Sequence, residues 1–234
     1  EPEVTIALGR LKGTQTNVKG TYKRVNVFRG IPFAKAPLGS LRFSPPEPPE
    51  PWTGLRDATS YPSLCPQDLS ILKIAEKNLK EKHIAFQTSE DCLYLSVYSP
   101  AGSSKKDKLS VCVSHPFVSD VMVWIHGGNF IFGGAARYDG SALSAYENGV
   151  VVMIQYRLGL LGLFNTGDEH ARGNWAYLDQ VAALGWVQGN IEHFGGDPGS
   201  VTLFGISAGS CSVFAHVLSP LSKGLFHKAI SESG

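Results

Sequence analysis

The sequence predicts an α/β fold built around a mostly parallel central sheet. Three continuous apolar runs carry this prediction: residues 121–125, 150–154 and 201–204. Strands that are buried on both faces of a parallel sheet have this composition, because helices cover both sides of the sheet. Glycine-rich turns and helical patterns separate the runs, and such alternation is typical of α/β architecture. At 234 residues the chain is long enough for one large domain or two small ones.

The N-terminal region is expected to be rich in hairpins. Three short stretches alternate or run apolar between glycines: residues 4–8, 25–28 and 31–33. Five of residues 45–51 are proline, so residues 41–53 are predicted to be an extended surface segment anchored by Phe43 and Trp52. A proline-rich ligand for another domain is the alternative interpretation.

Helical spacing predicts helices at residues 69–82, 141–147 and 174–193. Asn174 is the expected N-cap of the last of these. Its buried side is predicted to comprise Leu178, Val181, Ala182, Gly185 and Trp186. A further helix after residue 207 is expected to bury Val213, Phe214, Val217 and Leu218. Strands are expected at residues 90–98 and 228–231, whereas the apolar residues 109–120 are not assigned an element.

Composition excludes several classes of partner. A net charge of +1 without a basic patch or an acidic tail argues against nucleic acid and anionic membranes. The longest apolar run, residues 150–164, contains Gln155 and Arg157 and is too short for a membrane span. The chain opens on Glu1-Pro2-Glu3, so any secretory signal is expected to have been removed or never to have existed.

The four cysteines have no metal-ligand spacing, so neither a metal nor another cofactor is expected. Cys65 and Cys92 flank a polar segment that a disulfide would close, whereas Cys211 is expected on a buried helix face. We predict one disulfide and two free thiols.

A glycine-framed serine, Gly205-Ile206-Ser207-Ala208-Gly209, follows the third apolar run directly. A strand that passes through such a sequence into a helix is typical of a nucleophile elbow, in which the serine hydroxyl stands clear on a sharp turn. The five-residue pattern also arises by chance, so its context has to decide.

A second glycine-rich segment, His126-Gly127-Gly128-Asn129-Phe130, follows the first apolar run and is called the oxyanion loop below. It fits no dinucleotide- or phosphate-binding pattern. Paired glycines after a strand can instead turn backbone N–H groups into a cleft, where with the amide of Ala208 they would stabilise an oxyanion. The two segments together predict a hydrolase of the esterase kind.

Seven motifs resemble those of the type-B carboxylesterases, which have the α/β-hydrolase fold. They are Phe28-Arg29-Gly30-Ile31-Pro32-Phe33-Ala34, Ser89-Glu90-Asp91-Cys92-Leu93-Tyr94-Leu95, Val123-Trp124-Ile125-His126-Gly127-Gly128, Gln155-Tyr156-Arg157-Leu158-Gly159, Gly173-Asn174-Trp175, Phe194-Gly195-Gly196-Asp197-Pro198 and the elbow. Residues 45–50, 63–69 and 166–171 look closest to the mammalian carboxylesterase 2 branch. The resemblance implies that residues 1–234 are the N-terminal part of a single α/β-hydrolase domain.

The resemblance implies roles for particular residues. Ser207 would be the nucleophile, with an oxyanion hole formed by Gly128, Asn129 and Ala208. It also implies a Cys65–Cys92 disulfide and two structural ion pairs, Arg42 with Glu90 and Arg157 with Asp179. The expected substrates are small-molecule carboxylic esters, amides and thioesters, handled in the endoplasmic reticulum lumen or outside the cell. The resemblance leaves the oligomeric state open.

The sequence departs from the family pattern in three respects. Ile206 stands where the family usually has glutamate, and Asn129 replaces a glycine of the oxyanion loop. The acid and histidine of the triad should follow Ser207, yet none of His216, His227 and Glu232 among the next 27 residues fits that role. The histidines before Ser207 are expected to be scaffold or loop residues, and His126 is expected to support the oxyanion loop.

These departures predict an acyl-enzyme carboxylesterase that is impaired in this chain. The alternative is an inactive truncated isoform or a cholinesterase-like interaction fragment. The last expected strand, residues 228–231, would be an exposed sheet edge and would make the chain poorly soluble. Residues 109–120 are hypothesised to be an added loop.

Overall fold

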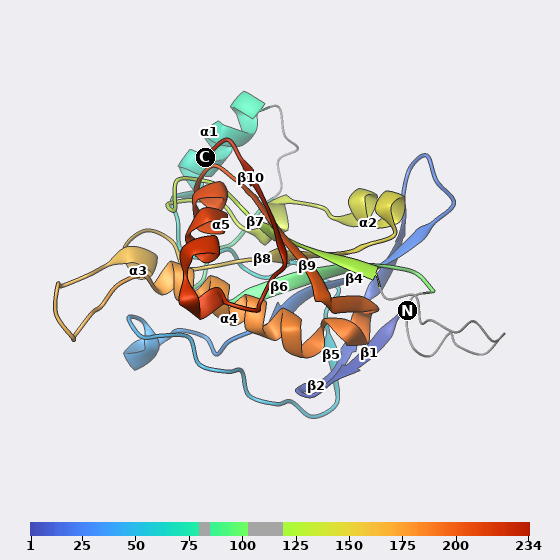
Figure 1. Cartoon of the computed structure of the whole chain (residues 1–234), viewed down its shortest axis with the longest axis horizontal. Coiled ribbons are helices and arrows are strands. Elements are labelled where there is room, and N and C mark those ends of the chain that lie inside the picture. Colours follow the sequence, from blue (N-terminus) through green and yellow to red (C-terminus); the bar gives the residue numbers. More distant parts are fainter. Residues whose placement is uncertain (80–84, 103–118) are drawn as a thin grey trace.

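The computed structural model describes residues 1–79, 85–102 and 119–234, without the side chain at residue 79 (Figure 1). The strands are β1 (Glu3–Ile6), β2 (Gly9–Lys12), β3 (Thr14–Asn17), β4 (Arg24–Pro32), β5 (Leu55–Asp57), β6 (Tyr94–Pro100), β7 (Ser119–Ile125), β8 (Val150–Ile154), β9 (Gly196–Ile206) and β10 (Lys228–Glu232). The α-helices are α1 (Leu69–Leu79), α2 (Ser141–Glu147), α3 (Gly159–Leu163), α4 (Trp175–Asn190) and α5 (Ala208–Leu218).

A seven-stranded sheet forms the centre of the fold, in the order β10-β9-β7-β8-β6-β4-β3. The strands β10, β9, β7 and β8 are parallel to one another, whereas β6, β4 and β3 continue the sheet in antiparallel pairing. The predicted α/β-hydrolase architecture is therefore confirmed, with an antiparallel part that extends to the β6–β8 pair. A separate three-stranded sheet has the order β1-β2-β5.

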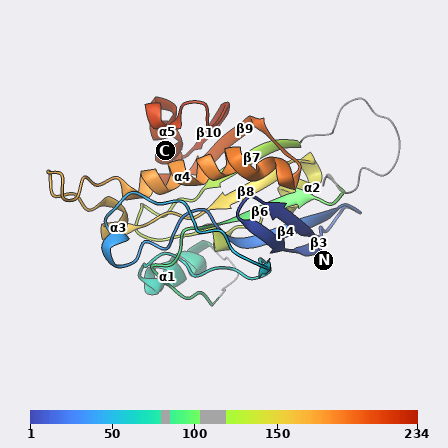
Figure 2. The ribbon, with the colours of Figure 1, turned by 90° about the horizontal axis from the view of Figure 1, so that it is seen from below.

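The central sheet is buried on both faces, as the apolar runs predict. Val123, Val152 and Leu203 belong to a core cluster that includes α4 and Val213 of α5. Their neighbours Trp124 and Met153 point to the opposite face, where they pack with Ala145 of α2. Figure 2 shows α4 lying along the sheet with α5 beside it.

The predicted helix 141–147 and strand 150–154 are confirmed to the residue. The two short N-terminal runs at residues 25–33 form one strand, β4, with an irregular register between Phe28 and Ile31. The Pro-rich segment is pinned as expected, since Trp52 Nε1 donates to the Arg10 carbonyl (2.9 Å) and Phe43 packs on Phe164.

The buried side of α4 differs from the predicted side. Gly185 is exposed and Val181 only half-buried, whereas Asp179, Gln180 and Ala183 are buried. The prediction was right for Trp186, which is buried, and for Ala182, which packs against the core. It was wrong for Gly185 and missed Asp179 and Gln180, because hydropathy selects apolar residues and these two polar residues find partners inside the protein. Asn174 occupies the N-cap position with φ of 63°, but its side chain makes no capping hydrogen bond.

The helix α5 buries less than predicted. Val213 is buried, but Phe214, Val217 and Leu218 are exposed, and Cys211 is an exposed free thiol instead of a buried one. Among the described elements, α5 contacts β7, β9 and β10, and its Ser212 and His216 bind Gln180 of α4. The periodic pattern therefore marks an apolar face that no described element covers.

Some expectations fall outside the described residues. They concern His83, His115, Cys112 and most of residues 109–120, while β7 begins at Ser119. In the described part of the chain, no helix is long and apolar enough to cross a membrane.

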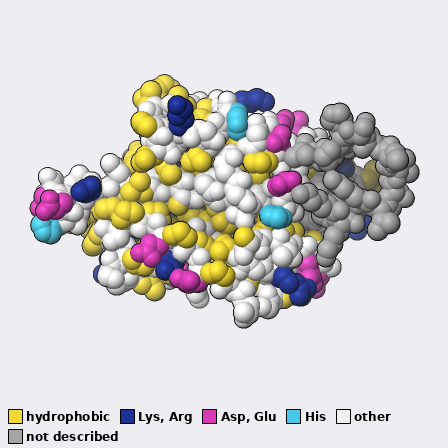
Figure 3. Space-filling view, turned by 60° about the horizontal axis from the view of Figure 1, so that its bottom comes forward, with side chains coloured by type: hydrophobic (Ala, Val, Ile, Leu, Met, Phe, Trp, Pro, Cys, Tyr) yellow, Lys and Arg dark blue, Asp and Glu magenta, His cyan; other side chains and the backbone are white. Residues whose placement is uncertain are grey.

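The exposed edge strand β10 predicts self-association of the chain. All five of its residues are exposed, among the described residues it pairs only with β9, and Ile230 is 44% exposed. The neighbouring face of α5 is also apolar, and hydrophobic side chains gather at this end of the molecule (Figure 3). We expect the apparent mass in sedimentation velocity to rise with protein concentration, because unpaired strand edges recruit other chains.

A charge on the edge strand should weaken this association, so Ile230→Lys is expected to shift the distribution toward monomer. The control is Tyr22→Lys, which replaces a fully exposed hydrophobic side chain between β3 and β4, at the opposite edge of the sheet from β10. A monomer at all concentrations for the unmodified chain would contradict the prediction.

Candidate active site

The strands β7, β8 and β9 end at the same edge of the sheet. Ile125 pairs with both Ile154 and Gly205, so the residues that follow these three strands start side by side. The oxyanion loop follows β7, Gln155 follows β8, and Ser207 follows β9. The parallel register therefore brings together segments that are far apart in the sequence.

Ser207 lies on a sharp turn between β9 and α5. Its φ of 54° and ψ of −120° are unusual for a residue with a side chain, as expected for a strained nucleophile elbow. A Cβ at Gly205 would lie 2.7 Å from the Gly209 carbonyl carbon, and one at Gly209 would collide with the Ile125 carbonyl. The two glycines let the elbow pack against the end of β7. Ser207 itself is exposed.

The oxyanion loop lies directly against this elbow. A Cβ at Gly127 would lie 2.7 Å from the Ile206 carbonyl oxygen and 3.3 Å from Ser207 Cβ. Asn129 adopts φ of 54°, in the left-handed region that asparagine tolerates better than most residues. The backbone therefore forms this turn without the glycine that the family usually has there.

Three peptide units at the site are held in place by a hydrogen bond that their carbonyl oxygen accepts, and this fixes the direction of their N–H groups. Gly127 O accepts from His126 Nδ1 (2.7 Å), Gly128 O accepts from the amides at 131 and 132, and Ser207 O accepts from Cys211 N (2.9 Å). In a trans peptide the N–H points away from the C=O. The N–H groups of Gly128, Asn129 and Ala208 are thus turned away from these partners, and among the described residues they have no acceptor.

His126, the first residue of the oxyanion loop, holds the loop through buried contacts. It is fully buried and stacks on Tyr156, whose hydroxyl donates to the His126 carbonyl (2.6 Å). Burial lowers the pKa of His126 to about 4, so the ring is neutral at pH 7. Because a carbonyl only accepts, Nδ1 carries the proton, and Nε2 has no partner in the described structure.

In the described residues, Ser207 Oγ makes no hydrogen bond to a histidine or a carboxylate. His216 is buried on α5, where Ser222 Oγ and Gln180 Oε1 each lie 2.8 Å from one of its ring nitrogens. His227 Nδ1 accepts from the Val201 amide, and Glu232 contacts Ser207 only through its backbone carbonyl.

The buried histidines predict a loss of stability in acid. Burial lowers the pKa of His216 to about 4, while an unfolded histidine titrates near 6.5. Between about pH 6.5 and 4 the unfolded chain binds a proton that the native ring resists, so stability falls with falling pH. At about 1.4 kcal/mol per pH unit, His216 would account for roughly 3 kcal/mol across this window.

Urea unfolding between pH 7 and 4 tests this. In the variant His216→Gln, position 216 no longer titrates, so the free energy of unfolding should fall less between pH 7 and 4 than in the unmodified chain. The variant His193→Gln, at an exposed position, should behave like the unmodified chain. Equal slopes for His216→Gln and the unmodified chain would contradict the assignment.

Two ion pairs are formed, Arg157 with Asp179 and Arg42 with Glu90. Asp179 accepts from Arg157 Nε (2.8 Å), Arg157 Nη2 (2.7 Å) and the Arg157 amide (3.0 Å), and both side chains are fully buried. Burial raises the pKa of the Asp179 carboxyl, and the bonds from Arg157 oppose that shift. Arg42 pairs with Glu90 at 2.6 and 2.8 Å in a more exposed position and also accepts, through its carbonyl, from Arg157 Nη1.

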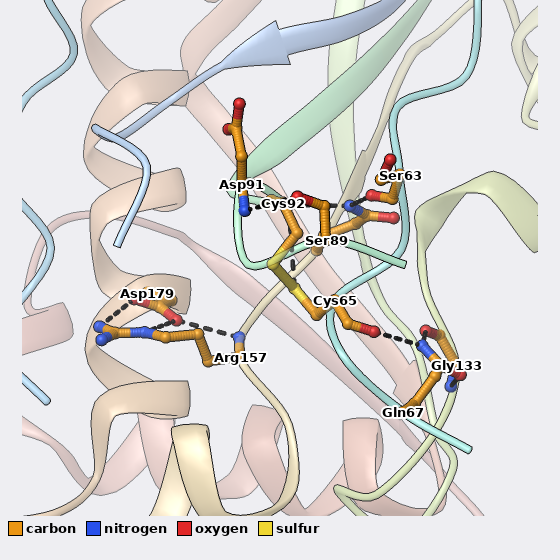
Figure 4. Close-up of a disulfide and its surroundings, with 10 residues drawn as sticks. Ser63, Cys65, Gln67, Ser89, Asp91, Cys92, Gly133, Arg157 and Asp179 are labelled. Atoms are coloured by element: carbon orange, nitrogen blue, oxygen red, sulfur yellow. Dashed lines mark hydrogen bonds and ion pairs between the residues drawn. A yellow bond between two sulfur atoms is a disulfide. The ribbon is translucent and has the colours of Figure 1, made fainter. Parts of the chain in front are cut away.

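The disulfide joins Cys65 and Cys92, as the resemblance implies (Figure 4). Sequence reasoning missed the side chains that tie its loop to the site, Gln67 and Gln155. Gln155 could have been found, because it follows a buried strand at the functional edge of the sheet. Gln67 carries no sequence signal. No cluster of metal-ligating side chains is present among the residues that the structure describes.

A model described as the carboxylesterase family matches residues 1–234. Curated relatives include a fatty acyl-CoA hydrolase precursor, medium chain, from Anas platyrhynchos, 59% identical over the whole chain and 41% of the relative. Carboxylesterase 1E of Rattus norvegicus is 57% identical over the whole chain and 40% of its own length. Pyrethroid hydrolase Ces2e of the same species is 57% identical over 97% of this chain and 38% of its own length. These close identities single out no branch of the family.

A solved structure titled thermophylic PNB esterase superposes with a TM-score of 0.83 at 44% identity. It covers 99% of this chain, which corresponds to 44% of that protein. The chain therefore spans about two fifths of the length of the curated relatives it matches.

Proposed function

The chain belongs to the carboxylesterase family, and from this premise we propose that it carries the nucleophile and the oxyanion hole of a serine ester hydrolase. The observation that supports the proposal best is the arrangement at Ser207. A strained, exposed serine lies beside the oxyanion loop, and the described residues offer the backbone amides of Gly128, Asn129 and Ala208 no acceptor. Such donors stabilise the negative charge that develops when a hydroxyl attacks a carbonyl.

The proposed reaction has two steps. Ser207 Oγ attacks the acyl carbon, its proton passes to a base, and the alcohol leaves with a proton as the acyl-enzyme forms. Water then attacks the acyl-enzyme and regenerates the serine with release of the carboxylic acid. In both steps the carbonyl oxygen becomes an oxyanion, and the amides of Gly128, Asn129 and Ala208 would bind it.

Turnover by the described residues is proposed to be slow. No imidazole or carboxylate in the described structure contacts Ser207 Oγ, so the described residues give the serine no positioned general base. In other serine hydrolases, loss of a triad member leaves about 10³- to 10⁴-fold acceleration over water from the oxyanion hole and binding. We therefore expect a measurable but weak esterase.

The proposed substrates are small-molecule carboxylic esters, amides and thioesters. Relatives named as a fatty acyl-CoA hydrolase and a pyrethroid hydrolase support this breadth. The proposed location is the endoplasmic reticulum lumen or the outside of the cell, because the Cys65–Cys92 disulfide suits an oxidising compartment.

A non-catalytic interaction role is the second candidate. The exposed apolar face of α5 and the unpaired edge of β10 favour it, since such surfaces mark sites of protein association. This role does not require Ser207 to be reactive, so labelling of the serine separates the two candidates.

The test is labelling with a fluorophosphonate probe, which is expected to modify the unmodified chain and leave Ser207→Ala unlabelled. The matched control is Ser40→Ala, at an exposed serine outside the site, which should label normally. Hydrolysis of p-nitrophenyl acetate should follow the same order. Equal labelling of the unmodified chain and Ser207→Ala would remove Ser207 as the activated nucleophile, and no labelling at all would favour the interaction role.

A further inference from the structure

Gln67, in the loop that the Cys65–Cys92 disulfide closes, reaches the segment after the oxyanion loop (Figure 4). Its Nε2 donates to the Gly133 carbonyl (2.7 Å), and the Gly133 amide donates to its Oε1 (2.8 Å). Nε2 also donates to the Cys65 carbonyl (3.0 Å). One side-chain amide thus binds both backbone groups of Gly133, as a neighbouring strand would.

Gly133 in turn packs on the oxyanion loop. It is buried with φ of +116°, and a Cβ there would lie 2.6 Å from His126 Nδ1 and 2.7 Å from the Gly127 carbonyl oxygen. These two atoms form the hydrogen bond that orients the Gly127 peptide unit, and with it the Gly128 amide. A shift of Gly133 would therefore be transmitted directly to an oxyanion-hole donor.

The backbone near Cys65 and Cys92 is held by several buried contacts. Gln155 Nε2, at the end of β8, donates to the carbonyls of Ser63 (3.0 Å) and Cys92 (2.8 Å). Leu64 is fully buried and packs in a cluster with Ala136, which follows the oxyanion loop. The disulfide, Gln155 and this cluster fix the backbone on both sides of Gln67.

We propose that Gln67 is a positioning residue for the oxyanion hole, through which the disulfide loop sets the direction of the Gly128 amide. The proposal rests on the proposed function of Ser207. The path runs from the Gln67 amide to the Gly133 backbone, and from there to the His126–Gly127 hydrogen bond. None of these groups is the proposed nucleophile or one of the three proposed donor amides, so Gln67 would act only through the geometry of the loop.

The first test replaces Gln67 by leucine, which removes both hydrogen bonds to Gly133 while keeping a side chain of similar size. The second-order rate of fluorophosphonate labelling at Ser207 should fall on the order of 10- to 100-fold, because small misplacements of catalytic donors have effects of this size. Gln87→Leu, in the same loop and exposed, should label at the unmodified rate.

The second test uses Gln67→Glu, which keeps the shape of the side chain and makes its donor depend on pH. At pH 8 the carboxylate can accept from the Gly133 amide but faces the carbonyls of Gly133 and Cys65 without a proton. At lower pH the protonated acid restores a donor. The labelling rate relative to the unmodified chain should rise as pH falls from 8 to 5.5, whereas Gln87→Glu should show no such recovery.

A third measurement does not depend on reactivity: backbone amide exchange of residues 127–129 by NMR. Gln67→Leu should speed exchange at Gly128 and shift its resonance, with β8 unchanged. Altered Gly128 exchange in a chain that labels nowhere would support the positioning role and reject the proposed function. Normal labelling and unchanged Gly128 exchange in Gln67→Leu would overturn the positioning role and leave the proposed function standing. If Gln67→Leu does not fold, the pH recovery of Gln67→Glu decides, and its absence overturns the proposal.

Discussion

Replacing Asp179 by alanine is expected to lower the free energy of unfolding by about 3 to 5 kcal/mol. The change leaves the Arg157 guanidinium charged in a fully buried position, with its Nε, Nη2 and backbone amide deprived of their acceptor. The Nη1 bond to the Arg42 carbonyl remains, and one neutral acceptor cannot compensate a buried charge. Urea unfolding followed by tryptophan fluorescence at pH 7 measures the loss.

Two further variants show whether the loss of stability comes from the unpaired buried charge or from the loss of a contact. The double variant Arg157→Met and Asp179→Leu should recover much of the stability, because a buried ion pair is often replaceable by apolar side chains of similar volume. The exposed pair of Arg10 and Glu3, at 2.7 Å, is the control, and Glu3→Ala should change stability by about 1 kcal/mol or less. A similar loss in Asp179→Ala and Glu3→Ala would contradict this account.

Replacing Gly128 by alanine should lower the rate of Ser207 labelling by about 10²- to 10³-fold, the effect of losing one oxyanion-hole donor. Gly128 has φ of +112°, and a Cβ there would collide with the Phe132 carbonyl. The turn that holds the Gly128 carbonyl against the amides at 131 and 132 would have to open, which would also reorient the Asn129 amide.

The matched control is Gly185→Ala on the exposed side of α4, where a Cβ meets nothing within 4 Å. This variant should label normally and gain up to about 1 kcal/mol of stability, as is usual for glycine to alanine in a helix. Asn129→Gly should also label normally, because the left-handed backbone that Asn129 already adopts suits glycine. Normal labelling of Gly128→Ala would exclude its amide from the oxyanion hole.

The sheet and the elbow could be predicted from sequence because their signals are local. Continuous apolar runs identified β8 to the residue, and the glycines at 205 and 209 marked the turn at Ser207. Hydropathy identified Trp186 of α4 and Val213 of α5 as buried but failed on other residues of these helices, because the buried side also depends on partners that are distant in sequence. Asp179 is buried because Arg157 meets it, and Phe214 is exposed because no described element covers it.

The sequence by itself determined the α/β class, the family and the identity of the candidate nucleophile, because each depends on residues close together in the chain. Only the tertiary structure decided how the site is held. The parallel register places Ser207 beside the oxyanion loop, and carbonyl partners orient the three amides. Gln67 reaches Gly133, in the segment after that loop, across 66 positions of sequence, a contact that only packing in three dimensions creates.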